Sequence, residues 1–243
     1  MLHTTKGIVI HQFKFKEKSV IAKIYTEKFG MQSYIINGVR SKKSANKYAY
    51  LQPLSLVEIN AYHKENRGLQ QLKSIKLDVP LNEIPFDVIK GSIAFFVAEI
   101  IHKSIKEEEP NISLFSFLHQ SILELDLANK NFSNFHIYFL VLFTKHLGFS
   151  PELPQNLSTK ELYFDLQEGT FTPIKPFHPV FLEKEFGATV SYILAHGYKG
   201  LNELSINNQQ RSVLLNGMID YFNIHSENFD FLKTKEVFEE LFI

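Results

Sequence analysis

Hydrophobic and polar residues alternate over most of the first 80 residues, a period of two that is typical of half-buried β-strands. Turn signals such as Glu27-Lys28-Phe29-Gly30 and Gly38 separate the alternating stretches. The predicted strands are Lys6–Phe15, Ser19–Thr26, Met31–Asn37, Leu54–Tyr62 and Leu69–Leu77. Five short strands in about 75 residues leave little room for helix, and the OB-fold is the commonest five-stranded barrel. We therefore expect an OB-fold β-barrel in residues 1–80.

Beyond Pro80 and Pro85 the hydrophobic period becomes helical, with apolar residues three and four positions apart. The predicted helices are Phe86–Lys106, Ser113–Leu127, Asn134–Leu147, Pro179–His196, Asn207–Ile224 and Thr234–Phe242. Between the third and fourth helices, Leu162–Leu166 and Thr170–Ile174 flank Gln167-Glu168-Gly169 and predict a small hairpin. The expected fold class is α+β: an OB-fold domain over 1–80, then an α-helical domain over 81–243 with a β-hairpin insertion at about 151–178.

The formal net charge of zero conceals a strong asymmetry along the chain. Residues 1–80 contain 14 Lys and Arg against five Asp and Glu, which gives 14 − 5 = +9. The rest of the chain contains 26 − 14 = 12 bases and 26 − 5 = 21 acids, or −9. A basic segment on an acidic body attracts a polyanion at one end only. The asymmetry therefore indicates nucleic acid as a partner.

The best candidate site is the polar, basic stretch 39–48, which lacks a hydrophobic period and predicts an exposed loop. Single-stranded nucleic acid is held by cations that follow the phosphates and by aromatic rings that stack on bases. The candidate DNA-binding residues are Lys14, Lys16, Arg40, Lys42, Lys43, Lys47, Tyr48 and Arg67, with Tyr48 as a stacking platform. Such a basic run is also typical of a solubilising turn, and the +9 excess favours binding.

Catalytic and metal-binding patterns are weak. The chain has no cysteine, which excludes disulfides, thiolate nucleophiles and cysteine zinc sites. Its ten histidines do not show the spacing of metal ligands. Glu107-Glu108-Glu109 is typical of a solvated helix end. A nuclease would need clustered carboxylates in the basic segment, where the five acidic residues are scattered. We expect no enzyme, no metal and no cofactor. The N-terminal residues lack a secretory pattern and the apolar stretches are short, so we expect a cytoplasmic protein without a membrane partner.

Several segments resemble, in order and spacing, those of the bacterial DNA repair protein RecO family. They are Gly7–Ile10, Thr26–Gly30, Asn37–Ser44, Leu51–Glu58, Leu147–Leu153 and Leu232–Lys235. The resemblance covers nearly the full length and implies an OB-fold followed by an α-helical domain. It also implies a nucleoid-associated recombination mediator that binds single- and double-stranded DNA and anneals complementary strands. With RecR, such a protein helps a recombinase replace single-stranded DNA-binding protein on gapped DNA.

The chain departs from the family pattern at one place. Many family members carry a four-cysteine zinc module just after the segment that corresponds to Leu147–Leu153, whereas 154–178 contains no cysteine here and only the lone His178. One histidine cannot replace four ligands, so we predict no zinc. We expect the hairpin to be held by apolar side chains instead, namely Leu162, Phe164, Phe171 and Ile174.

Two other functions remain open from the residues alone. An OB-fold RNA-binding protein with a helical protein-interaction domain would have the same charge pattern, and competition between single-stranded DNA and RNA of equal sequence would distinguish it. A purely structural scaffold would show no salt-sensitive DNA binding at all.

Overall fold

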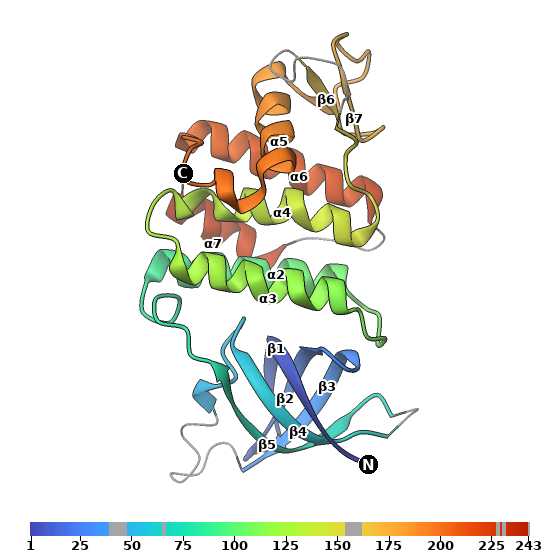
Figure 1. Cartoon of the computed structure of the whole chain (residues 1–243), viewed down its shortest axis with the longest axis vertical. Coiled ribbons are helices and arrows are strands. Elements are labelled where there is room, and N and C mark those ends of the chain that lie inside the picture. Colours follow the sequence, from blue (N-terminus) through green and yellow to red (C-terminus); the bar gives the residue numbers. More distant parts are fainter. Residues whose placement is uncertain (39–47, 65–66, 154–161, 227–228, 230–231, 243) are drawn as a thin grey trace. The chain divides into compact units, whose positions relative to one another are not determined.

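The structure is a computed structural model that describes residues 1–38, 48–64, 67–153, 162–226, 229 and 232–242. The chain forms two compact units, Met1–Leu127 and Ala128–Ile243. The first unit contains a β-barrel and the first two long helices, and the second contains the remaining helices and a small sheet (Figure 1).

Five strands close into the barrel of the first unit: β1 (Leu2–Phe15), β2 (Ser19–Thr26), β3 (Gly30–Asn37), β4 (Leu56–Tyr62) and β5 (Gln70–Val79). Their order around the barrel is β1-β2-β3-β5-β4, in which β3 and β5 pair in parallel and β4 pairs with β1; Figure 1 labels the five strands. Closure removes the exposed strand edges. The predicted five-stranded OB-fold barrel is confirmed, although β1 begins four residues before its predicted start.

The barrel core follows from the period-two pattern. Val20, Ala22 and Ile24 of β2 are fully buried and face inward, so the alternate residues of the strand lie on the outer face. Val9, Tyr34 and Ile59 complete the same core from β1, β3 and β4. The Tyr34 hydroxyl is enclosed with them, and burial raises the pKa of this phenol well above its usual value.

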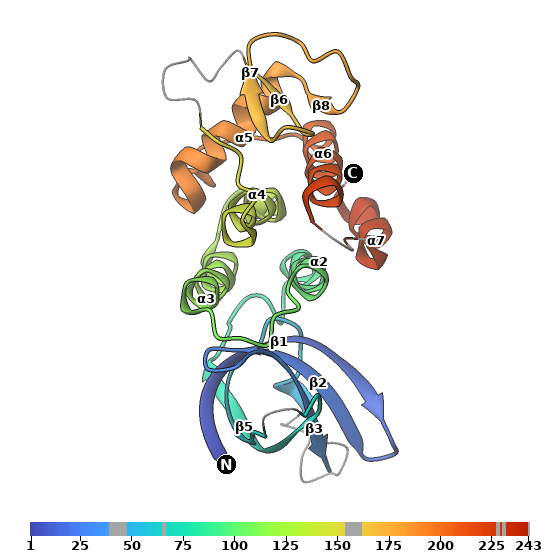
Figure 2. The same cartoon turned by 90° about the vertical axis from the view of Figure 1, so that its right-hand side faces the viewer.

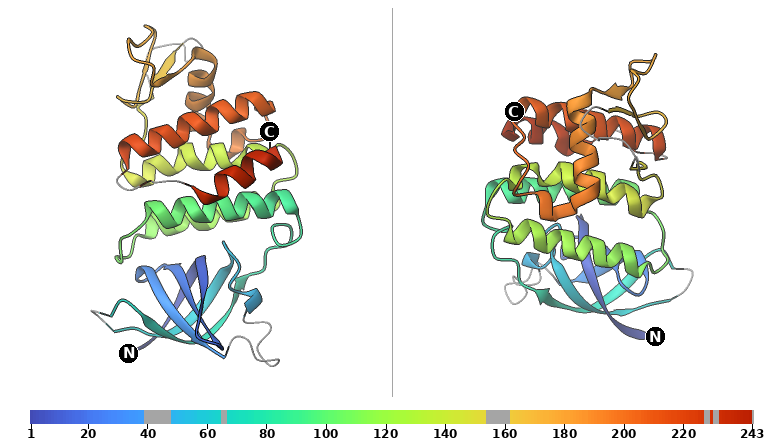
Figure 3. Two further views of the ribbon diagram at one scale, coloured as in Figure 1. Left: turned by 180° about the vertical axis from the view of Figure 1, so that it is seen from behind. Right: turned by 45° about the horizontal axis from the view of Figure 1, so that its top comes forward.

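Two helices complete the first unit, α2 (Val88–Ser104) and α3 (Ile112–Leu127), which run side by side over the barrel (Figures 2 and 3). Asp87 caps α2, accepting hydrogen bonds from the Ile89 and Lys90 amides at 2.8 and 2.9 Å. The predicted helix Phe86–Lys106 is thus confirmed with both ends shortened.

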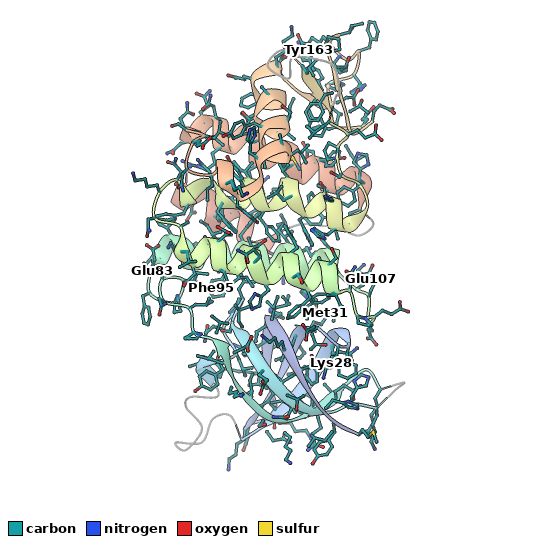
Figure 4. All side chains as sticks on the ribbon, in the orientation of Figure 1. Lys28, Met31, Glu83, Phe95, Glu107 and Tyr163 are labelled. Atoms are coloured by element: carbon teal, nitrogen blue, oxygen red, sulfur yellow. The ribbon has the colours of Figure 1, made fainter. Side chains whose placement is uncertain are left out.

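The segment between α2 and α3 lies along the start of β3. The main-chain carbonyl of Glu107 accepts a hydrogen bond from the Met31 amide at 3.1 Å, and both residues are labelled in Figure 4. Gly30 adopts a φ of +61° at this contact, where the carbonyls of Glu107 and Glu109 leave no room for a Cβ atom. The side chains of Glu107, Glu108 and Glu109 are exposed, as predicted, but these residues lie beyond the end of α2 at Ser104 and not in the helix.

The second unit contains the helices α4 (Phe135–Leu147), α5 (Lys184–His196), α6 (Asn208–His225) and α7 (Lys233–Phe242), with 3₁₀ turns at Phe132–Asn134 and Gly197–Gly200. Its sheet has the order β7-β6-β8, from β6 (Tyr163–Asp165), β7 (Thr170–Thr172) and β8 (Phe181–Leu182). The predicted hairpin is present, and β8 is an added strand. Two residues are too few to show a period, so the sequence pattern assigned β8 to a helix.

Hydrogen bonds and apolar packing hold this sheet together. Asp165 accepts from the Gln167 and Glu168 amides at 2.9 and 3.1 Å, and its other oxygen lies 3.1 Å from His178 Nε2. Leu162, Phe164 and Phe171 are buried, as predicted. Ile174 is 72% exposed, so its predicted packing role is wrong: it lies two residues beyond the end of β7 and outside the ladder.

Candidate nucleic-acid interface

The structure describes four of the eight residues predicted to bind DNA: Lys14, Lys16, Tyr48 and Arg67. Arg40, Lys42, Lys43 and Lys47 lie outside the described residues. The four described side chains are all exposed. Their positions on the barrel fall into two separate places.

Lys14, Lys16 and Tyr48 share one end of the barrel. Lys14 stands at the end of β1 opposite Val20, and Lys16 follows in the turn to β2, where it adopts a φ of +55°. Tyr48 is fixed to the same end because the Gln12 side-chain amide donates to its hydroxyl oxygen at 3.1 Å. Gln12 and Lys14 are two residues apart in β1 and therefore point to the same side of the strand. The structure thus places three of the predicted residues at the same end of the barrel, with the Lys16 ammonium 5.4 Å from the centre of the Phe15 ring.

Arg67 belongs to a different place, the connection between β4 and β5. This connection is organised by the buried Gln70, whose side chain accepts from the Lys64 amide and donates to the carbonyls of Lys64 and Arg67 at 2.8–3.0 Å. The β4–β5 connection begins after Tyr62, which pairs with Leu2 at the start of β1. Lys14 stands at the far end of the same strand, so Arg67 does not join the group around Tyr48.

Other charged groups lie at the start of β1 and at the beginning of the β4–β5 connection. The N-terminal ammonium donates to the His63 carbonyl at 3.1 Å, and the Lys28 ammonium donates to the Thr4 carbonyl at 2.7 Å. The rings of Phe29 and His63 stack at 4.0 Å between centroids, and His3 meets Phe29 edge-on at 5.4 Å. The barrel therefore presents a second basic and aromatic region, which the sequence pattern did not separate from the first.

Ion pairs neutralise two of the barrel's lysines. Lys6 lies 3.0 Å from Asp78, and Lys76 lies 2.9 Å from Glu58. Hydrogen bonds to these carboxylates, supported by their charge, raise the pKa of both ammonium groups. Within the described part of the chain, none of the ion pairs involves Lys14, Lys16 or Lys18. The cations at the Tyr48 end thus remain available to an external anion.

Sequence reasoning missed an aromatic row on β1. His11, Phe13 and Phe15 alternate with Gln12 and Lys14, so they lie on the opposite side of the strand from the Tyr48 contact. The ring centroids of His11 and Phe13 are 6.2 Å apart. An aromatic residue at every second position was the available signal. On its own this signal indicates only strand propensity, because the sequence does not show which face of a strand is covered.

Within the described residues, no group of three or more His, Asp or Glu side chains gathers in a way that could hold a metal ion. Across the same residues, the helices are too short or too polar to cross a membrane.

Comparison with known proteins identifies both parts of the chain. Residues 1–78 match the family model described as "Recombination protein O N terminal", and residues 85–235 match "Recombination protein O C terminal". The "DNA repair protein RecO" of Phocaeicola vulgatus is 34% identical over the full length of both chains. The proteins of the same name from Flavobacterium psychrophilum and Flavobacterium johnsoniae are 36% and 37% identical over 98% of each chain.

The matched ranges span the barrel and most of the helical part in the order in which they occur here, and the relatives align with this chain from end to end. The resemblance in the segments around Gly7, Asn37 and Leu51 therefore extends over the whole sequence. The chain belongs to the RecO family.

Proposed function

We propose that this protein is a non-enzymatic recombination mediator of DNA repair, which binds DNA on its barrel and anneals complementary single strands. One observation carries the proposal: Lys14, Lys16 and Tyr48 stand together at one end of a barrel that belongs to the +9 segment. Cations that follow phosphates, beside a ring that can stack on a base, are what single-stranded DNA requires. The membership of this chain in a family of DNA repair proteins supports the same function.

Annealing needs no covalent chemistry. Two complementary strands repel each other, and a basic surface that neutralises phosphates on both lowers that repulsion and raises their local concentration. Base pairing then proceeds by itself. The acidic remainder of the chain, at −9, disfavours DNA by like charge, so we assign residues 1–80 to DNA, single- or double-stranded, and residues 81–243 to protein partners.

The proposed partners are RecR, single-stranded DNA-binding protein and the recombinase that is loaded on gapped DNA. Membership in the RecO family supports this choice of partners. A protein that works on such DNA would be found in the cytoplasm at the nucleoid.

A charge reversal tests the proposal. The variant combines Arg40→Glu, Lys42→Glu and Lys43→Glu, and its matched control combines Lys130→Glu, Lys145→Glu and Lys199→Glu, three exposed lysines of the second unit. Both variants change the net charge by the same amount. We expect the first to lose oligonucleotide binding and annealing and the control to retain them, with thermal unfolding nearly unchanged in both.

The wild-type protein provides further checks. If about five phosphates are neutralised, the affinity for single strands should fall with salt with a log–log slope of roughly −3.5. Equal loss of binding in both charge variants, or binding that ignores salt, would contradict the proposal. Preference for RNA over DNA of equal sequence would favour an RNA-binding function, and magnesium-dependent loss of a labelled oligonucleotide would indicate a nuclease.

A further inference from the structure

The outer face of strands β1, β2 and β3 is only partly covered. Toward the middle of the sheet, Tyr25 of β2 stacks on Phe115 of α3 with centroids 6.3 Å apart, and His11 of β1 stacks on His102 of α2 at 5.5 Å and 12°. Beyond His11 the cover of β1 ends, although Ile21, the β2 partner of Phe13, is still buried at 8% exposure. Phe13, the next outward residue of β1, is 43% exposed. A strand that continues past its covering helix normally turns polar, and this one presents an aromatic ring.

Phe13 belongs to an apolar row that crosses the three strands. It pairs with Ile21 of β2, which pairs with Ile35 of β3, so all three side chains lie on the same outer face. The neighbouring rows are polar at β2 and β3. On one side, His11 is followed by Lys23 and Ser33. On the other side, Phe15 is followed by Ser19 and Asn37, which are joined by a hydrogen bond of 2.9 Å.

Two cations flank this row. Lys23 stands opposite His11, and the Lys16 ammonium lies 5.4 Å from the centre of the Phe15 ring. In the part of the chain that the structure describes, neither lysine takes part in an ion pair. Burial lowers the pKa of His102 to about 4, and the charge of Lys23 contributes to this shift. The His102 ring that stacks on His11 is therefore uncharged at neutral pH.

We propose that Phe13 is a base-stacking platform for single-stranded DNA, with Phe15 beside it and Lys16 and Lys23 at the flanking phosphates. The proposal deepens the function assigned to the barrel and depends on it. An exposed ring between cations fits a strand whose bases are free, because every base has a face that stacks on an aromatic side chain. In a duplex those faces are occupied by neighbouring bases. The row therefore selects single strands, whereas the excess positive charge of residues 1–80 attracts any DNA.

The absence of tryptophan from the chain allows a direct test. Phe13→Trp places one fluorophore in the row, and its emission should be quenched by a thymidine oligonucleotide but not by an abasic oligonucleotide of equal length and charge. Phe95→Trp is the matched control, because Phe95 is also an exposed phenylalanine, at 54%, but lies on α2 outside the row. Equal responses to both oligonucleotides at Phe13→Trp would overturn the proposal.

Affinity provides a second readout. Phe13→Ala should weaken binding of the thymidine oligonucleotide about tenfold and leave binding of the abasic one within about twofold, since one stacked base is lost. Phe13→Leu, which keeps the contact with Ile21 but not the ring, should behave like Phe13→Ala. Phe95→Ala should bind both oligonucleotides like the wild type.

The outcomes separate this proposal from the one on which it rests. If the wild type binds neither oligonucleotide, the DNA-binding function itself fails. If it binds both with a steep salt dependence and Phe13→Ala keeps the preference for bases, only the stacking platform is wrong. A change of oligomeric state in Phe13→Ala, measured by sedimentation without any change in base preference, would assign the row to contact with a second copy and would also overturn the proposal.

Discussion

The Gln12 side-chain amide donates a hydrogen bond to the Tyr48 hydroxyl oxygen over 3.1 Å, which joins β1 to the residue that follows segment 39–47. The contact fixes the tyrosine ring at the end of the barrel that also presents Lys14 and Lys16. A ring held in place loses less conformational entropy on binding than a free one. The hydrogen bond would therefore favour the stacking role that we propose for Tyr48.

Substitutions at Tyr48 separate the ring from its hydroxyl group. Tyr48→Ala should weaken single-stranded DNA binding by roughly 1–2 kcal/mol, because it removes a stacking surface. Tyr48→Phe, which loses only the hydrogen bond to Gln12, should cost less than about 0.5 kcal/mol. Fluorescence anisotropy with a labelled oligonucleotide measures both. Wild-type affinity in Tyr48→Ala would show that the ring makes no contact with DNA.

The barrel could be predicted because each strand carries its own local signal. Val20, Ala22 and Ile24 alternate with outward residues, and Gly30 and Gly38 mark the ends of β3. The order β1-β2-β3-β5-β4 is not local information: the sequence predicted only that five short strands close as an OB-fold barrel, and the structure supplies the order. The start of β1 could not be predicted from local pattern, because the strand extends to Leu2 through its pairing with β4, which is distant in the sequence.

The candidate site could be predicted in composition but not in arrangement. Lys14, Lys16 and Tyr48 meet through the β1–β2 turn and the Gln12 hydrogen bond, whereas Arg67 lies with the start of β1. The sequence composition does not distinguish these four residues, because it does not show where each one lies on the barrel. The exposure of Phe13 was likewise invisible, since it depends on where α2 stops covering the sheet.

Asp126 holds the start of the helical segment against α3, and its removal should destabilise the first unit. The carboxylate is buried and accepts from the Asn82, Glu83 and Ile84 amides at 2.9 Å each. Asp126→Asn replaces one acceptor oxygen with a donor that faces an N–H group, so we expect a loss of about 2–3 kcal/mol. Urea unfolding measures it. The control is Asp220→Asn on the exposed side of α6, and equal stability of the two variants would contradict the assignment.

Gly30 is required for both its conformation and its lack of a side chain. Gly30→Ala would strain a φ of +61° and push a methyl group into the carbonyls of Glu107 and Glu109. Gly38 has a similar φ of +72°, and no atom of the described residues lies within 4 Å of a Cβ atom placed there, so Gly38→Ala measures the cost of backbone strain. We expect about 1 kcal/mol of destabilisation for Gly38→Ala and at least about 3 kcal/mol for Gly30→Ala by thermal unfolding. Similar losses of stability in the two variants would show that the segment after α2 moves away from the added methyl group at little cost.

The small sheet of the second unit should fold without zinc. Asp165 accepts from two amides and approaches His178, whose Nδ1 accepts from the Val180 amide at 3.2 Å, so local hydrogen bonds already join β6 to the segment before β8. We expect zinc well below one equivalent by elemental analysis of purified protein, and a melting temperature that a chelator does not change. His178→Ala should lower that temperature by a few degrees, as the loss of about 1 kcal/mol would. Stoichiometric zinc would refute the prediction.

His136 should make the second unit sensitive to acid. Its imidazole is fully buried in α4, next to Phe238 with ring centroids 4.5 Å apart, and burial together with the charge of Arg211 lowers its pKa to about 3. The unfolded chain binds a proton here near pH 6.5 and the folded chain does not. Neutral His136 therefore leaves the free energy of unfolding unchanged above about pH 6.5. As the pH falls from there toward 3, the free energy of unfolding decreases by up to about 1.4 kcal/mol per pH unit.

His136→Phe removes this titration while it keeps a buried ring. Urea unfolding of both proteins at several pH values between 7 and 5 should give a curve for the variant that is flatter by up to about 1.4 kcal/mol per pH unit. The comparison between the two proteins is needed because His102 also has a pKa lowered by burial, to about 4, and adds its own slope to both curves. His136→Gln serves as a second variant in case phenylalanine packs poorly. Parallel curves for the wild type and both variants would mean that His136 takes up its proton equally in the folded and unfolded chain, and that its burial carries no cost in acid.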